Sequence, residues 1–538
     1  MKGLLLTLLL VLTIILGVSS SVVHQKGEQF HQKVKQQFES GILPAGSPIY
    51  DYTCTVNPEY QSCTVVPTHE QNTTFCPTVP ACLQYADLLG SKSLNIKVQA
   101  GRYSDCVGYM QGNFKLINIE PYSSIDIVKF TCNSTFLQYT SNSVAKMTIT
   151  INNLNILSTA SVGPAMGCFA VSSPYGSLLQ ITNTYIGGCR SNLNGGAINA
   201  QGFYVVLNSS TISDSYSNQN GGAVYSDDQI IALNSYFQGC SAKIAGGAFY
   251  TEQLAMYACT VNQCNASRSG VMQSNITVIT GYTVLSENSA LVTGGVSDIQ
   301  KGSYFSANST QFFSNFARNV GVLNIKTAQT KFQAYNCFFL SNNGTGAGTI
   351  RVELNSNDEP FNLDLTKSVF EYNNAQSIIG GDDVDFNAAF LSGSSIIGGY
   401  FMSKKSFTPQ YDSNLNWVNV RVSSDCPASK PVKNILYTSE YQCGQVYGSC
   451  SGYAKVNYYG NVYDCTSDSS SSTDSSSNSW YSSSSWGEWS SSSFESWSSS
   501  SSSSDEEHGS ILAAYLFTMV VALLSLCIFF TVVIPGFR

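Results

Sequence analysis

The chain has 538 residues and a formal net charge of −8, and only 11% of its residues are charged. Ordinary soluble domains carry roughly 25% charged residues, yet the hydrophobic fraction here is a normal 43%. Ser, Thr, Asn and Gly supply the missing polarity, which favours a β-rich extracellular protein and argues against a helical cytosolic enzyme. No dense basic patch appears in the body of the chain, so we expect no nucleic-acid partner.

Residues 1–20 have the pattern of a secretory signal peptide. Lys2 gives a short basic start, residues 3–16 are almost continuously apolar, and Val18 and Ser20 are small enough to precede a cut near Ser21. An uncleaved N-terminal anchor helix is the alternative. In either case the pattern predicts that the chain enters the secretory pathway.

The cysteines indicate disulfides at both ends of the chain. There are 17, and Cys527 lies in a hydrophobic tail, which leaves an even 16 behind the predicted leader. We predict an N-terminal cysteine-containing cap at 21–93, continuing into the first coils up to Cys132, and a C-terminal cap at 426–465. A small independent disulfide module at either end is the alternative. None of the spacings is typical of a zinc site, so we expect no metal and no cofactor.

The most informative feature is an internal repeat, which is clearest over residues 186–380. One ladder position recurs in steps of 24 to 31 residues, at Cys189, Ser215, Cys240, Cys264, Asn288, Asn315, Asn342 and Asn373. An apolar residue stands three positions earlier in every copy, from Ile186 to Phe370, and a small residue two positions later, from Ser191 to Ala375. Glycine follows four positions further in seven of the eight copies, at Gly195, Gly221, Gly246, Gly270, Gly294, Gly321 and Gly348.

Coils that return about every 25 residues can stack at the ~4.8 Å spacing of paired strands. Equivalent residues then lie above one another. The apolar positions become a buried stripe, the glycines take backbone angles that other residues resist, and a buried Asn column satisfies the polar groups of adjacent coils. The segments alternate and are rich in Val, Ile, Thr, Tyr and Phe, which excludes a helical solenoid. We therefore predict an all-β, right-handed parallel β-helix solenoid over residues 94–425.

The repeats resemble those of a known family. The Gly-Gly-Ala-aliphatic motif stands at 195–198, 221–224 and 246–249, and Phe-x-x-Asn at 312–315, 339–342 and 370–373. Both look like the repeats of bacterial polymorphic outer-membrane proteins, whose right-handed β-helix passengers include many adhesins. Residues 95–103 are similar to the opening strand of pectin-lyase-like helices. This resemblance implies the fold; the C-terminus, a single hydrophobic segment, differs from the family's outer-membrane barrel.

The C-terminal part predicts a tether. Residues 466–510 form a Ser-rich low-complexity stalk with scattered aromatics, which cannot bury a core. Residues 511–533 are apolar for long enough to span a bilayer as a helix, and 534–538 would form a short cytoplasmic tail. Acidic residues precede this segment and Arg538 follows it, so we expect a single-pass plasma-membrane protein with its body at the cell surface. A GPI signal is the alternative.

Several residues are candidates for modification or chemistry. Glycosylation sequons stand at Asn72, Asn133, Asn208, Asn265, Asn275, Asn308 and Asn343. Cys240 and Cys264 fall on adjacent coils at the same ladder position, where they form either a disulfide or a pair of free stacked thiols. Asp382, Asp383 and Asp385 resemble the double-aspartate motif of polygalacturonases, and Asp227-Asp228 is another acidic pair. All four histidines lie outside the repeats, so a histidine-assisted site on the helix is excluded, and a solvated turn is the simpler interpretation of 382–385.

These observations favour adhesion or binding of a glycan or protein ligand along a ridged β-helix surface. A polysaccharide-active hydrolase or lyase is the second hypothesis, and a passive surface coat is the third.

Overall fold

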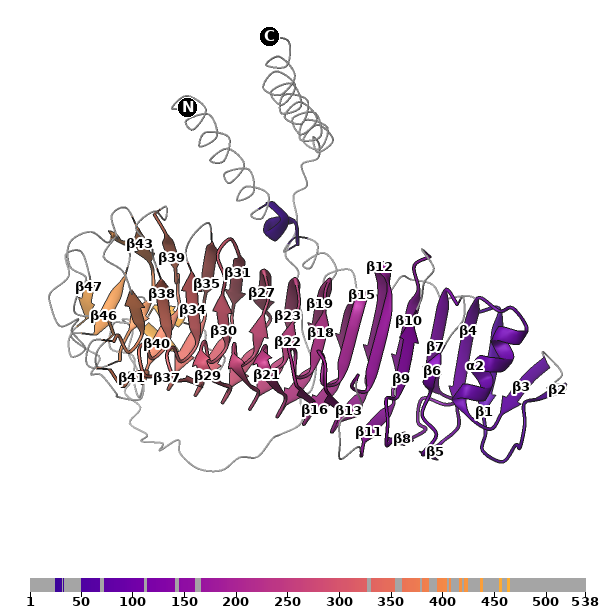
Figure 1. Cartoon of the computed structure of the whole chain (residues 1–538). Coiled ribbons are helices and arrows are strands. Elements are labelled where there is room, and N and C mark those ends of the chain that lie inside the picture. The colour runs from indigo at the N-terminus through magenta and orange to yellow at the C-terminus, as the bar shows by residue number, and fades with distance from the viewer. Residues whose placement is uncertain are drawn as a thin grey trace, which may run out of the picture. The chain divides into compact units, whose positions relative to one another are not determined.

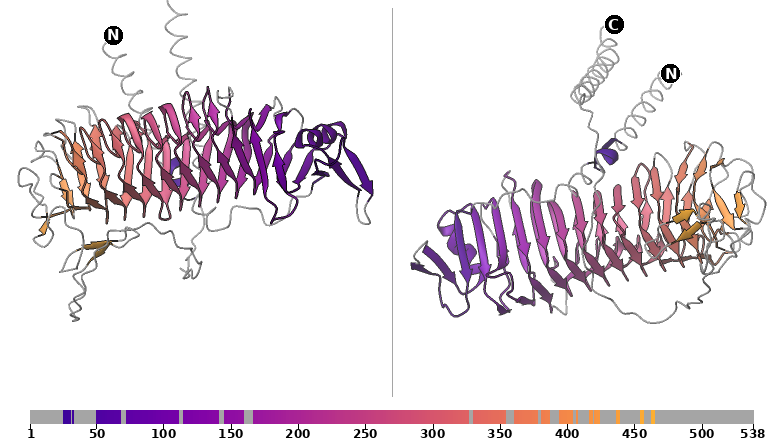
Figure 2. Two further views of the ribbon diagram at one scale, coloured as in Figure 1. Left: turned by 90° about the horizontal axis from the view of Figure 1, so that it is seen from below. Right: turned by 180° about the vertical axis from the view of Figure 1, so that it is seen from behind.

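The chain folds into a stack of parallel β-coils (Figures 1 and 2). The computed structural model describes residues 25–30 and 32 and, from 50 to 423, everything except 68–71, 111–113, 141–144, 160–165, 327–329, 354–359, 378–379, 387–393, 404–405, 408–415 and 419. Beyond these it describes 436–438, 454–456 and 462–464. The predicted all-β parallel solenoid is confirmed, because each strand pairs in parallel with its counterparts one coil before and after.

The largest sheet has 25 strands and contains two columns of stacked strands. Column 1 consists of β6 (Gly108–Met110), β9 (Leu137–Thr140), the first part of β12 (Phe169–Thr182) and of β15 (Ile198–Asn208), β18 (Val224–Ser226), β22 (Phe249–Tyr250), β26 (Met272–Gln273), β30 (Ser297–Ile299), β34 (Leu323–Lys326), β38 (Ile350–Glu353) and β42 (Val384–Phe386). Column 2 consists of β1 (Tyr52–Val56), β4 (Ser93–Val98), β7 (Leu116–Pro121), β10 (Thr148–Asn152), the second part of β12 and β15, β19 (Gln229–Leu233), β23 (Gln253–Tyr257), β27 (Ile276–Thr280), β31 (Tyr304–Asn308), β35 (Lys331–Tyr335), β39 (Asn362–Asp364), β43 (Ser395–Ile397) and β45 (Asn416–Val418).

Two further sheets complete each coil. The 14-stranded sheet contains β5 (Gly101–Tyr103), β8 (Val128–Cys132), β11 (Asn155–Ser158), β13 (Tyr185–Gly187), β16 (Thr211–Ser213), β20 (Tyr236–Gln238), β24 (Thr260–Asn262), β28 (Val284–Ser286), β32 (Gln311–Phe313), β36 (Phe338–Leu340), β40 (Val369–Glu371), β44 (Tyr400–Phe401), β46 (Arg421–Ser423) and β47 (Leu436–Thr438). The eight-stranded sheet contains β14 (Arg190–Ser191), β17 (Tyr216–Ser217), β21 (Ser241–Ala245), β25 (Asn265–Arg268), β29 (Ser289–Thr293), β33 (Phe316–Ala317), β37 (Asn343–Gly344) and β41 (Asn374–Ala375). A separate antiparallel pair joins β48 (Ala454–Val456) to β49 (Val462–Asp464).

The repeat positions found in the sequence align as the repeat predicts. The apolar column from Ile186 to Phe370 and the small-residue column from Ser191 to Ala375 are both in register through all eight coils. Inside the tube, the rings of Phe312, Phe339, Phe370 and Phe401 stack with centroid separations of 4.5, 4.5 and 4.7 Å. This aromatic file fills the core of the later coils.

The glycine column differs from the prediction. Gly195, Gly221, Gly246 and Gly294 take φ values between 64° and 68°, as expected. Gly270, Gly321 and Gly348 do not have a positive φ; they align with Gly196, Gly222, Gly247 and Gly295, where a Cβ would strike a carbonyl oxygen of the next coil. In the repeats that have a single glycine, this glycine therefore stands where two backbones approach closely, and not where the chain makes a left-handed turn.

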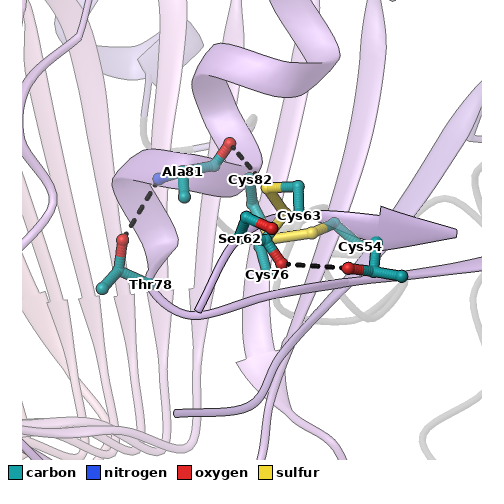
Figure 3. The surroundings of a disulfide bond; sticks show 8 residues. Cys54, Ser62, Cys63, Cys76, Thr78, Ala81 and Cys82 are labelled. Atoms are coloured by element: carbon teal, nitrogen blue, oxygen red, sulfur yellow. Dashed lines mark hydrogen bonds between the residues drawn. A yellow bond between two sulfur atoms is a disulfide. The ribbon is translucent and has the colours of Figure 1, made fainter. Parts of the chain in front are cut away.

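The N-terminal end of the stack is closed by a disulfide-bonded segment (Figure 3). β2 (Thr64–Pro67) pairs antiparallel with β3 (Asn72–Cys76), and β3 pairs in parallel with β1. The α2 helix (Val79–Leu88) begins after Thr78, whose side chain accepts a hydrogen bond of 3.3 Å from the Ala81 amide. Because β1 itself pairs with β4, the stack starts inside the region 21–93 that we expected to precede the coils.

The described cysteines form four disulfides, Cys54–Cys82, Cys63–Cys76, Cys106–Cys132 and Cys168–Cys189. Cys240, Cys259, Cys264 and Cys337 are free and buried. Burial raises the pKa of both Cys259 and Cys337 to about 12, so these thiols stay protonated and unreactive. For Cys240 and Cys264, the structure contains the stacked thiols and not the disulfide.

Several predictions fall outside the described residues. They are the leader at 1–20, all but three short strands of the region from 426 onward, the stalk at 466–510, the hydrophobic segment at 511–533 and the tail at 534–538. Within the described part of the chain, no helix is both long and apolar enough to cross a membrane.

Candidate binding groove

The outward face of column 1 carries a file of side chains that are polar or aromatic in every coil but one. In β18, Val224 and Ser226 are buried and Tyr225 between them points outward, as the two-residue period of a strand requires. Strand register places equivalent residues on this file in every coil. In order they are Gln138, Ala170, Asn199, Tyr225, Tyr250, Gln273, Asp298, Asn324, Arg351 and Asp385.

Two hollows follow the first part of this file. One, of about 230 Å³, is lined by Gln138, Ala170 and Asn199 among others. The other, of about 560 Å³, is lined by Tyr225, Tyr250 and Gln273 among others. Asn199 and Tyr225 are direct neighbours in the strand register, so the hollows lie over consecutive strands of the file. We call the surface over these six residues the ladder groove; five strand spacings of ~4.8 Å give it a length of about 24 Å.

The floor of the ladder groove is aromatic and amide-rich. The Tyr225 and Tyr250 rings stack with their centroids 5.7 Å apart and their planes 15° apart. Tyrosine offers an apolar ring with a polar hydroxyl at its tip. Beside them, the Gln273 side chain is fixed by two hydrogen bonds: its Oε1 accepts from the Ser269 hydroxyl at 2.8 Å, and its Nε2 donates to the Asp298 carbonyl at 3.1 Å.

The walls of the groove carry charged groups of both signs. The turns between columns 1 and 2 supply Asp227, Glu252 and Asn275, and the eight-stranded sheet supplies Arg268. Asp227 is held in place because its Oδ1 accepts a hydrogen bond of 2.7 Å from the Gly202 amide. Glu252 and Arg268 are exposed. The walls therefore offer hydrogen-bond donors and acceptors together, with one cation against two anions.

Beyond Gln273, the same file is occupied by polar groups that contact one another. Asp298 Oδ1 accepts from Asn324 Nδ2 at 2.8 Å, and its Oδ2 lies 3.5 Å from Lys326 Nζ. Arg351 Nε lies 3.2 Å from Asp385 Oδ2. These charges are largely buried, and a buried charge is tolerated when it is paired. The part of the file suited to an external ligand is therefore the ladder groove itself.

Asp227, from the second predicted acidic pair, lines the groove, whereas the three aspartates of the double-aspartate motif do not. Asp382, Asp383 and Asp385 are all buried, with 5%, 0% and 5% of their surface exposed. Asp382 Oδ1 accepts from the Ala375 amide at 2.8 Å, and Asp385 pairs with Arg351. None of the three lines the ladder groove. Their contacts hold the fold, and the simpler alternative of a solvated turn does not describe them.

Asp383 has a specific structural place, at the end of a buried asparagine ladder. Asn288, Asn315 and Asn342 each donate through Nδ2 to the Oδ1 of the next asparagine, at 3.0 to 3.1 Å. The last one, Asn373, donates to Asp383 Oδ1 at 2.9 Å, and the Ser403 hydroxyl donates to the same oxygen at 2.6 Å. Burial raises the pKa of Asp383 to about 7, although these hydrogen bonds lower it in part.

The sequon asparagines lie at the surface of the coils. Asn133, Asn265, Asn275 and Asn308 are exposed, and Asn208 and Asn343 are half-buried; Asn72 begins β3. Asn275 also lines the ladder groove. Glycosylation of these residues stays a prediction.

Comparison with known proteins adds no assignment: no family model, no curated protein and no solved structure matches this chain. The groove is therefore interpreted from its own residues. Sequence reasoning missed Tyr225, Tyr250 and Glu252, although a signal was present, because the residue after each Gly-Gly-Ala-aliphatic motif is the one that points outward.

Proposed function

We propose that this protein is a cell-surface, right-handed β-helix of the pectin-lyase-like type that binds a carbohydrate chain in the ladder groove. The observation that carries the proposal is the stacked Tyr225–Tyr250 pair on the floor of a groove whose walls are amides, carboxylates and one guanidinium. Tyrosine offers an apolar ring with a polar tip, and sugar rings present both apolar faces and hydroxyls to such a surface.

The charges of the walls favour a neutral or weakly charged chain. Asp227 and Glu252 oppose a polyanion, and Arg268 alone does not balance them. The groove is about 24 Å long by the strand-spacing estimate, so a ligand with several repeating units can follow it. Localisation at the plasma membrane through residues 511–533, or through a GPI anchor instead, would place this groove outside the cell.

The test is glycan-array binding by the full chain in detergent micelles, followed by affinity measurement on the best ligand. Tyr225→Ala with Tyr250→Ala removes both rings; at 0.5–1.5 kcal/mol for each aromatic contact beyond its buried area, we expect a loss of about tenfold or more. Tyr122→Ala is the control, because Tyr122 is a 54% exposed tyrosine outside the groove. Unchanged affinity in the double variant would contradict the proposal, and an array without any ligand would favour a passive coat.

A second function is favoured by one observation. Asp227 and Glu252 lie on adjacent coils and line the same hollow. Retaining glycosidases use two carboxyl groups about 5–5.5 Å apart. If the bound polymer is cut, new reducing ends appear, and Glu252→Gln abolishes them while leaving binding intact. Binding without new reducing ends excludes hydrolysis by this pair.

A further inference from the structure

A second apolar cluster lies outside the tube, on the outward face of column 2. Alternate residues of these strands point outward, and they are apolar where a solvated strand would have polar residues. We call the following set the outer stripe: Val206, Ile231, Leu233, Ala255, Ile276, Val278 and Tyr304. All seven are at most 7% exposed. The interior of the tube is filled by the inward-pointing neighbours of these residues. The outer stripe must therefore be covered from outside the tube.

Phe30 is the one described residue of this cluster that does not come from a coil. It belongs to a short helical segment at residues 25–30 and 32, shown in indigo beside the strands of column 2 in Figure 1. Within the segment, Gly27 and Phe30 are buried and Lys26, Glu28 and Gln29 are exposed. Positions three apart share one face of a helix, so the segment has one face against the coils and the other toward solvent.

The contact at Gly27 is specific for glycine. A Cβ at this position would lie 2.5 Å from Tyr304 Cγ and 2.7 Å from Tyr304 Cδ2. Tyr304 in turn donates a hydrogen bond of 3.4 Å to Glu28 Oε1. Burial under the segment, with the Glu28 carboxylate close by, raises the pKa of Tyr304 to about 12. The backbone of the segment therefore lies directly against a tyrosine ring of β31.

We propose that the outer stripe is a docking surface whose occupant is the chain's own N-terminal segment, residues 25–30 and 32, and that this segment is a displaceable cover over an apolar face. The link between this segment and the first coil is long enough for the segment to reach the outer stripe. The 18 peptide steps from Gln32 to Tyr50 reach at most about 60 Å, and the nine strand spacings from β1 to β31 cover about 43 Å. The segment precedes β1, so its release would leave the pairing of the coils unchanged.

The outer stripe lies next to the ladder groove. Asn275 lines the ladder groove and Ile276, the next residue, belongs to the outer stripe. An uncovered stripe would extend the groove with an apolar surface. Contiguous apolar patches are uncommon on soluble proteins and mark interaction surfaces, so displacement of the segment would offer a second surface next to the first.

The test uses the full chain in detergent micelles. Hydrogen exchange of residues 25–32 and hydroxyl-radical oxidation of the Tyr304 side chain are both read by mass spectrometry. In the wild type we expect protection of both. Gly27→Ala improves the helix propensity of the segment but places a methyl group in the Tyr304 ring, so we expect at least tenfold faster exchange and several-fold more oxidation of Tyr304. Phe30→Ala should act in the same direction. Gln29→Ala, on the solvent face, is the matched control and should match the wild type.

Three results would overturn the proposal. Unprotected exchange of residues 25–32 in the wild type, or wild-type protection in both Gly27→Ala and Phe30→Ala, would show that the segment does not dock on the stripe. Protection of Tyr304 that disappears on hundredfold dilution would show that another copy supplies the cover. These readouts do not involve a carbohydrate, so they are independent of the proposed function.

Discussion

The buried asparagine ladder makes a quantitative prediction for Asn342→Leu. Asn342 Oδ1 accepts from the backbone amide of Asn315 at 3.0 Å and from its Nδ2 at 3.1 Å, and Asn342 Nδ2 donates to the Phe312 carbonyl at 2.9 Å. Leucine is of similar size but would leave two N–H groups of Asn315 and the Phe312 carbonyl without these partners. It would also remove the hydrogen bond of 3.0 Å that Asn373 Oδ1 accepts from Asn342 Nδ2. Each orphaned buried group costs roughly 1–3 kcal/mol, and burial of the leucine offsets part of this. We expect a loss of about 4 kcal/mol.

The assay is urea unfolding followed by circular dichroism, with hydrogen exchange to locate the loss. Stability in stacked repeats depends on each unit and its neighbours, so the amides of β32, β36 and β40 should lose protection first. Asn374→Ala is the control, because Asn374 is exposed on the next coil, where it pairs with Asn343, and it should change stability by less than about 0.5 kcal/mol. Equal stability of Asn342→Leu and Asn374→Ala would refute the view that the ladder stabilises the stack.

Three further predictions concern other parts of the molecule. Burial raises the pKa of Asp383 to about 7 and that of Glu371 to about 8, so the folded chain holds protons that the unfolded chain releases near pH 4. The thermal unfolding midpoint should therefore decrease from pH 5 to pH 8, and Asp383→Asn should make this decrease smaller. A higher midpoint at pH 8 than at pH 5 would contradict the prediction. A glycan on Asn275 would occupy the groove wall, so in a glycosylating host Asn275→Gln should bind carbohydrate more tightly, whereas Asn133→Gln should have no effect; equal effects would contradict this placement. Reduction of Cys54–Cys82 and Cys63–Cys76 should expose the first coils to protease before the coils around Phe339, and uniform digestion would argue against a capping role.

The repeat in the sequence was sufficient to predict the solenoid, because the spacing of Ile186, Ile212 and their counterparts directly encodes the stacking register. The apolar and small-residue columns align as predicted. The prediction for the glycine column was only partly correct, because the sequence shows one glycine in some coils and two in others. Whether a glycine serves a left-handed turn or a close backbone approach depends on the neighbouring coil.

The candidate site was predicted less well. The sequence showed Asp382 and Asp383 as an acidic pair, but the burial of Asp383 depends on its hydrogen bonds from Asn373, ten residues earlier, and Ser403, twenty residues later. For Tyr225 and Tyr250, the repeat indicated an outward direction but not a binding role, since isolated tyrosines are common in strands. Their stacking appears only when adjacent coils are superposed. The contact of Phe30 with column 2 joins segments more than 170 residues apart and has no local signature.

The most direct test of the account is to locate a bound carbohydrate. An oligosaccharide from the array, carrying a photoreactive group, would be cross-linked to the full chain and the labelled peptides mapped by mass spectrometry. We predict labels on the peptides that contain Tyr225, Tyr250 and Asn275, at the floor and wall of the ladder groove. Labels confined to the 14-stranded sheet, on the strands from β5 to β47, would contradict the assignment of the groove as the binding site.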